Sequence, residues 1–240
     1  MVKLKIYLFR HGQSYFNRDH KFTGWLDSKL TSRGIKDAKK IAQKLKNKQI
    51  DLAVQTPLSR SKDTLKEVLK YHPECRKVDT DDRMIERSYG RWQGKTHEQF
   101  IKKSGLEEYK TMLHFHQLDH LSGKEKEIFI KKHGEEDLQV LRRGYTHQPP
   151  GGESIKMVEK RVLSFVRDLI KKMKKEQINV AISAHGNSMR PFRRYFEKLS
   201  IKEMMKLENP SRGKFWESKG KRPSEASMPP VFDRWCRFPF

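Results

Sequence analysis

The sequence has few cysteines, no long apolar run and too few acidic residues to balance its basic ones. Its 240 residues include two cysteines, Cys75 and Cys236, which form no Cys-x-x-Cys pair. We therefore expect neither a disulfide framework nor a zinc site, and a reducing, cytoplasmic compartment fits best. No apolar run approaches the ~18 residues of a membrane-spanning helix, and the first residues lack the apolar segment of a signal peptide. We expect no membrane association.

Charge is strongly biased to one sign. Lysine and arginine outnumber aspartate and glutamate by 53 to 30, which gives a net charge of +23. Such a field attracts polyanions and speeds the capture of small phosphorylated molecules. Most of the excess lies in lysine runs such as 171–172 and 174–175, which are typical of a solvated surface. No RNA- or DNA-binding motif accompanies them, so we expect no specific nucleic acid partner.

The apolar residues alternate between strand and helix periodicity along the chain. Strands are expected over 3–9, 50–54 and 179–183, and helices over 31–45, 152–176 and 201–207. Another helix follows the turn at 56–60 and carries Leu65, Val68 and Leu69, and a further one is capped by Ser188 and runs to Glu197. Strands that alternate with helices predict a layered α/β fold. We expect a three-layer α/β/α arrangement, in which helices flank a mostly parallel central sheet.

Two stretches depart from this rhythm. Residues 96–139 are rich in lysine, glutamate and histidine and separate core elements, which predicts an inserted helical cap. Residues 209–240 are rich in proline, arginine, serine and aromatic residues with little periodicity, and predict a basic, aromatic C-terminal tail that is either mobile or laid over a site. We therefore expect one domain over 1–208, with its core in 1–95 and 140–208.

Two His-Gly turns are the most informative local feature. The apolar run before His11 and the run before His185 each break at His-Gly into small polar residues; Arg10 precedes the first histidine and Arg190 follows the second. Ligands of open α/β sheets bind at the carboxyl ends of strands. Two imidazoles, arginines and free backbone N–H groups around one volume make an anion site with a nucleophile, and phosphate is the obvious anion. A lone Arg-His-Gly is common by chance, so ordinary turn histidines are the alternative interpretation.

The segments around and between the two turns favour a phosphate site over ordinary turn histidines. They are 9–14 with Asn17, 22–27 with 30–31, 56–61, 86–90 with 93–94, 142–144, 151–154 and 184–190. In this order and at these spacings, the chain resembles the histidine phosphatase superfamily and, within it, the bisphosphoglycerate-dependent phosphoglycerate mutases.

The resemblance implies the roles of the reacting groups. It makes His11 the nucleophile that becomes phosphohistidine, and a neutral imidazole is required for that step. Arg10 and Arg60 would disfavour the imidazolium and hold phosphoryl oxygens. His185 would contact the same oxygens. Glu86 would be the general acid and base at the departing and incoming oxygens.

The resemblance also implies a set of substrate contacts. Residues that match positions in contact with phosphate or substrate are Asn17, Thr23, Gly24 and Asn187, and those that match the clamp on the carboxylate and second phosphate are Tyr89, Arg142 and Arg143. Mutases usually have a lysine where this chain has His97, and Lys95 is a nearby substitute.

Three functions follow as alternatives. The first is a metal-independent mutase of glycolysis and gluconeogenesis that interconverts 3- and 2-phosphoglycerate, is primed by 2,3-bisphosphoglycerate and takes a small phosphorylated carboxylic acid; a homodimer is one option for its assembly. The arginine pair favours this function, whereas the long 96–139 segment and the unusual C-terminus depart from it. The second is a histidine-type phosphatase that hydrolyses a small phosphomonoester. The third is a basic binding protein with a relic active site, which the intact set of reacting groups disfavours.

Overall fold

A computed structural model describes residues 4–115, 118, 121–210 and 213–218. Among these residues, a five-stranded sheet has the order β3-β2-β4-β1-β5. The strands are β1 (Ile6–Arg10), β2 (Leu52–Gln55), β3 (Lys77–Thr80), β4 (Val180–Ala184) and β5 (Phe215–Glu217). The first four are parallel, and β5 runs antiparallel to β1. The predicted, mostly parallel sheet is therefore confirmed.

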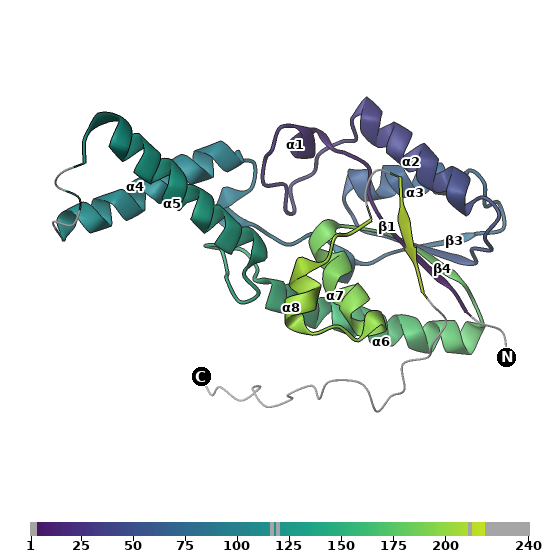
Figure 1. Cartoon of the computed structure of the whole chain (residues 1–240). Coiled ribbons are helices and arrows are strands. Elements are labelled where there is room, and N and C mark those ends of the chain that lie inside the picture. Colours follow the sequence, from purple (N-terminus) through teal and green to yellow (C-terminus); the bar gives the residue numbers. More distant parts are fainter. Residues whose placement is uncertain (1–3, 116–117, 119–120, 211–212, 219–240) are drawn as a thin grey trace, which may run out of the picture.

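Helices cover both faces of the sheet (Figure 1). On one face, α2 (Ser32–Leu45) and α3 (Ser59–Leu69) pack on Tyr7 and Phe9. On the other face, α6 (Ile155–Glu176) and α7 (Gly186–Glu197) pack on Ile6 and Leu8. Because alternate residues of β1 enter the two cores, the alternating pattern of the sequence reports both layers. The three-layer α/β/α arrangement is confirmed.

A helical hairpin projects from this body (Figure 1). It consists of α4 (His97–His114) and α5 (Gly123–Arg143), so α5 continues past the expected end of the insertion at 139. Gly105 and Gly134 allow the two helices to touch, since a Cβ at either position would collide with a backbone carbonyl of the other helix. A small apolar cluster of Phe22, Phe100, Leu138 and Leu141 joins the hairpin to the body.

The shorter elements include α1 (Tyr15–Arg18), α8 (Ile201–Lys206) and the 3-10 turns η1 (Asp82–Met84) and η2 (Gly90–Trp92). The expected N-cap at Ser188 is wrong, because α7 already begins at Gly186. The His185 carbonyl accepts the first helical hydrogen bond, from Met189 N at 3.0 Å. Ser188 is in the first turn, where its Oγ accepts from His185 N at 3.3 Å and donates to the Met84 carbonyl at 2.8 Å.

Strand β5 lies beyond residue 208, where the domain was expected to end. It pairs Phe215 with Phe9 and Glu217 with Tyr7. Its three residues are too few to produce a recognisable alternation, so the sequence did not predict this strand. The rest of the expected tail, residues 219–240, lies outside the described residues. In the part of the chain that the structure describes, no helix is long and apolar enough to cross a membrane.

Candidate active site

The two His-Gly turns meet at one edge of the sheet. Strands β1 and β4 pair in register, with Arg10 opposite Ala184, and His11 N donates to the Ala184 carbonyl at 3.1 Å. The rings of His11 and His185, each one residue past its strand, have centroids 4.9 Å apart. Both side chains are buried. The juxtaposition expected from the two turns is therefore present.

The local contacts of His11 fix its tautomer and its charge. Its Nδ1 lies 2.7 Å from the Gly12 carbonyl. A carbonyl only accepts, so Nδ1 carries the proton and the Nε2 lone pair stays free. Burial, followed by the nearby charges of Arg60 and Arg10, lowers the pKa of His11 well below 6.5. The ring is therefore neutral at pH 7, as the attack on phosphorus requires.

His185 is held by a hydroxyl in the adjacent β2–α3 turn. Its Nε2 lies 2.8 Å from Thr56 Oγ1, and its Nδ1 has no hydrogen-bond partner among the described residues. Burial and the proximity of His11 and Arg60 lower its pKa well below 6.5. Thr56 therefore fixes the orientation of a neutral imidazole ring. With its proton on Nδ1, the ring would donate a hydrogen bond to a phosphoryl oxygen. Sequence analysis assigned no role to Thr56.

Arg60 supplies a buried positive charge behind the histidines. Its side chain is fully buried in α3 and donates to the Gly24 carbonyl at 2.8 Å and the Leu26 carbonyl at 2.9 Å. Burial lowers its pKa to about 10, so the guanidinium remains charged at pH 7. These bonds also hold the 22–26 loop, whose Gly24 has a left-handed φ of 51° that favours glycine.

Glu86 is held rigidly by its backbone and by one carboxylate oxygen. Its Oε1 accepts from Arg87 N at 2.8 Å and from Asn187 N, in the first turn of α7, at 3.1 Å. Its carbonyl accepts from Trp25 Nε1 at 2.8 Å and from Arg161 Nη2 at 3.0 Å. With Oε1 engaged, Oε2 can carry a proton to or from a bound hydroxyl.

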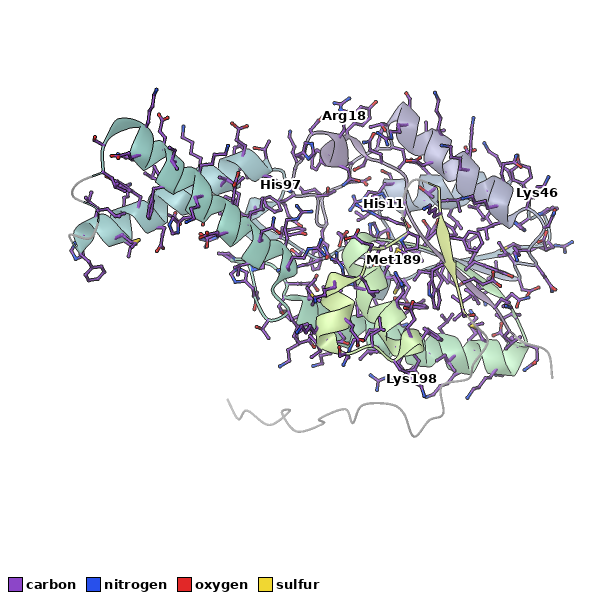
Figure 2. The ribbon with its side chains drawn as sticks, in the orientation of Figure 1. His11, Arg18, Lys46, His97, Met189 and Lys198 are labelled. Carbon is purple, nitrogen blue, oxygen red and sulfur yellow. The ribbon has the colours of Figure 1, made fainter. Side chains whose placement is uncertain are left out.

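A cavity of about 420 Å³ lies beside these groups. Ten of the expected site residues line it: Arg10, Asn17, Thr23, Gly24, Glu86, Tyr89, His97, Arg142, Arg143 and Asn187. His11 lines a smaller cavity of about 180 Å³ that shares Arg10 and Asn17 with the larger one. Arg60 and His185 line neither cavity and are buried behind it. Figure 2 shows His11 at the sheet edge and His97 where the cap joins the body.

The cap contributes the arginine pair and His97 to the cavity. Arg143 donates to the Met205 carbonyl at 3.1 Å and lies 3.8 Å from the Glu208 carboxylate. The His97 ring packs on Phe22 at 4.7 Å between centroids, and burial, followed by the charge of Arg142, lowers its pKa to about 4. His97 is therefore neutral at pH 7. The expected substitute, Lys95, lines a separate surface groove and does not reach this cavity.

Several lining residues were not assigned by sequence reasoning. They are His20, Lys21, Glu208 and Asn209. Arg190, which the second His-Gly turn placed among the arginines of the expected anion site, also lines the cavity and donates to Asn187 Oδ1 at 2.8 Å. Glu208 and Asn209 lie in a segment without a recognisable motif.

Buried Arg87 ties the site to the end of the cap. It donates to the carbonyls of Glu153, Leu141 and His147 at 2.6, 2.7 and 2.8 Å. Leu141 immediately precedes the arginine pair, so Arg87 positions that pair relative to Glu86. Among the described residues, no cluster of three or more histidine, cysteine, aspartate or glutamate side chains could hold a metal ion.

Comparison with solved structures agrees with this architecture. A structure called mycobacterial hydrolase 1 aligns with a TM-score of 0.68 at 23% identity, over 89% of this chain and 88% of that one. The mycobacterial glucosyl-3-phosphoglycerate phosphatase aligns with a TM-score of 0.66 at 22% identity, over 89% of each chain. At these identities, the likeness establishes the fold.

Sequence relatives give a finer comparison. The 2,3-bisphosphoglycerate-dependent phosphoglycerate mutase of Pseudoalteromonas atlantica is 30% identical over 84% of this chain and 87% of its own length. The enzyme of the same name from Chlamydia caviae is 33% identical over 85% and 88%. The family model of the histidine phosphatase superfamily, branch 1, matches residues 6–126 and 113–215. With both histidines, Arg60 and Glu86 gathered at the strand ends, the chain is an enzyme that belongs to branch 1 of the histidine phosphatase superfamily.

Proposed function

We propose that this enzyme is a phosphoglycerate mutase, which interconverts 3-phosphoglycerate and 2-phosphoglycerate through a phosphohistidine at His11. One observation carries the proposal: Arg142 and Arg143 enter, from the last turn of α5, the same cavity that holds Arg10 and Glu86. A three-carbon acid needs one cationic group at the transferred phosphate and another at its carboxylate. The names of the sequence relatives support this choice.

In one half-reaction, Nε2 of unloaded His11 attacks one phosphorus of the bisphosphorylated intermediate. The N–P bond forms while the bond from phosphorus to the substrate oxygen breaks, and Glu86 gives that oxygen a proton. Arg10 and Arg60 stabilise the charge on the phosphoryl oxygens during transfer. In the other half-reaction, the free hydroxyl oxygen of a monophosphoglycerate attacks the phosphohistidine, the N–P bond breaks, Glu86 receives the hydroxyl proton, and the bisphosphorylated intermediate forms in the cavity.

The cavity suits a primer with several negative charges. When bound, 2,3-bisphosphoglycerate supplies the phosphoryl group that loads His11. The lining carries more cations than carboxylates: Arg10, Lys21, Arg142, Arg143 and Arg190 against Glu86 and Glu208. We assign the first phosphate to Arg10 and Asn17, and the other anionic groups to Arg142 and Arg143.

A histidine-type phosphatase is the second candidate. His97 is neutral at pH 7 at the position where the resemblance to mutases predicts a lysine, so the cavity holds one cation fewer. A bisphosphorylated intermediate would be held less firmly there, and water could accept the phosphoryl group instead. The solved structures with this fold include named phosphatases.

Parallel mutase and phosphatase assays separate the two candidates. A chelator is present throughout, and each assay is run with and without 2,3-bisphosphoglycerate. A mutase converts 3- to 2-phosphoglycerate faster than it releases phosphate, and only after priming. Phosphate release as the main outcome, or interconversion that requires added manganese, would refute the proposal.

Arg143→Ala and Arg193→Ala form a matched pair for these assays. Both arginines donate to carbonyls of the 205–208 segment, at Met205 and Glu208, but only Arg143 lines the cavity. For a mutase we expect Arg143→Ala to raise KM roughly tenfold or more and to increase hydrolysis, because a charge-assisted contact is lost. Arg193→Ala should leave both KM and the rate of hydrolysis close to the wild-type values. Equal effects of both variants would assign Arg143 a structural role only.

We further propose that the enzyme works in cytoplasmic glycolysis and gluconeogenesis, as a homodimer. Light scattering of the purified chain tests the dimer, since a monomeric mass at micromolar concentration would exclude it. Localisation of a tagged full-length chain tests the compartment.

A further inference from the structure

Helix α2 carries a face of unopposed positive charge. Its exposed basic side chains, with Lys46 just beyond its end, form what we term the α2 basic face: Arg33, Lys36, Lys39, Lys40, Lys44 and Lys46. The one acidic residue of the helix, Asp37, is buried. Within the described residues, none of the six cations forms an ion pair. Lys46 lies at the far end of α2 in Figure 2.

The other long helices mix both signs of charge, so the overall excess of lysine does not explain this face. Helix α4 carries Glu98, Glu107 and Glu108 among its lysines, and α5 carries five acidic residues along its length. The lysine-rich helix α6 exposes Asp168 and Glu176. On α4, Lys103 lies 4.0 Å from Glu107. Of these four helices, only α2 presents its cations without an exposed carboxylate.

This arrangement works against the helix that carries it. Lys36, Lys40 and Lys44 are spaced four residues apart, and like charges at that spacing destabilise a helix. Arg33 lies in the first turn, at the positive end of the helix dipole, and no acidic residue accompanies it there. Burial of Ile41 and Leu45 in the core holds the helix in place. Arg33 also lines the smaller cavity beside His11, but the five lysines line neither active-site cavity. The fold does not need these lysines, so their placement points to an anionic partner.

We infer that the α2 basic face binds the phosphate backbone of double-stranded nucleic acid without reading its sequence. Lys36, Lys40 and Lys44 advance along the helix by about 6 Å per step in a row slightly inclined to its axis, which suits a linear array of phosphates. Single strands are bound mainly by stacking on aromatic side chains, and α2 has none. Insertion into a lipid surface requires apolar side chains, and Ile35 is the only large exposed one of α2. This inference is independent of the proposed function.

Fluorescence anisotropy with a labelled duplex of mixed sequence, about 20 base pairs long, tests the inference. The variant replaces Lys36, Lys39, Lys40 and Lys44 with glutamine. The control replaces four exposed cap lysines, Lys102, Lys110, Lys131 and Lys132, and so changes the net charge equally. If each of the four α2 lysines neutralises one phosphate, the plot of log K for association against log salt becomes less steep by about 3.6 in the variant. We expect a loss of at least tenfold in affinity at about 0.1 M salt, and a loss below about twofold in the control.

Several results would overturn the inference. Equal losses in the variant and the control would show a general charge effect, and no binding by the wild type at low salt would exclude the partner. Loss of binding to phosphatidylserine vesicles with duplex binding unchanged would assign the face to lipid. None of the four α2 lysines lines either active-site cavity, so circular dichroism and phosphoryl transfer should be unchanged in the variant.

Discussion

Replacement of Arg87 with methionine tests how the cap is tied to the catalytic body. The side chain is fully buried, and its three hydrogen bonds to the carbonyls of Glu153, Leu141 and His147 are 2.6–2.8 Å long. Methionine has a similar length but donates nothing, so three carbonyls lose their partner at about 1–3 kcal/mol each. Relief of the cost of burying a charge offsets part of that loss. We expect the free energy of unfolding to fall by about 4 kcal/mol.

Urea unfolding followed by circular dichroism measures this loss, and thermal melting should show Tm lower by about 8–16 °C. Arg83→Met is the control, because Arg83 pairs with Asp81 and Asp168 while 32% of its side chain is exposed. Exposed pairs contribute about 1 kcal/mol or less. Because Arg87 also positions Arg142, Arg87→Met should raise KM in the folded enzyme. Equal losses of stability in both variants, or an unchanged KM, would refute this reasoning.

Three further predictions concern titration, packing and charge. First, burial lowers the pKa of His185 in the folded state, so below about pH 6.5 the unfolded chain binds more protons than the folded one and the free energy of unfolding should fall from pH 7 to 5. Urea titrations of His185→Gln should show a smaller dependence of that free energy on pH, and an unchanged dependence would contradict the assignment. Second, Gly105→Val places side-chain atoms against a backbone carbonyl of α5, and thermal melting should report a loss of about 2–3 kcal/mol; a wild-type melting curve would exclude the close contact. Third, Glu208 lies 3.8 Å from Arg143 and competes with an anionic substrate, so Glu208→Gln should lower KM several-fold with little change in kcat; the cap variant Glu136→Gln is the charge-matched control, and an equal response would reduce the effect to net charge.

The position of the candidate site could be predicted because its signals are local. Strand periodicity places a histidine at the end of β1 and another at the end of β4, and parallel pairing brings the two ends together. The tautomer of His11 follows from its own neighbour, the Gly12 carbonyl. The site residues expected beside these turns, Arg10, Asn17 and Asn187, line the cavities.

The features that could not be predicted depend on contacts between distant segments. Strand β5 is too short to carry a period, and it forms because β1 offers an unpaired edge. Ser188 has the composition of an N-cap, yet the strand-to-helix turn at His185 starts the helix earlier. Glu208 reaches the cavity because the segment around it lies against Arg143, which donates to the Met205 carbonyl. No local pattern encodes these approaches.

The proposed function separates the phosphoryl transfer step from the choice of acceptor. His11, Glu86 and the buried Arg60 are held by contacts within the body. Under the proposed function, these groups form and break the N–P bond, and the acceptor is selected in the part of the cavity where Arg143 and His97 enter from the cap. That part keeps its geometry only while the cap is tied to the body and the 205–209 segment is in place. We therefore expect a change in the cap or in this segment to shift the balance between transfer and hydrolysis while the nucleophile stays the same.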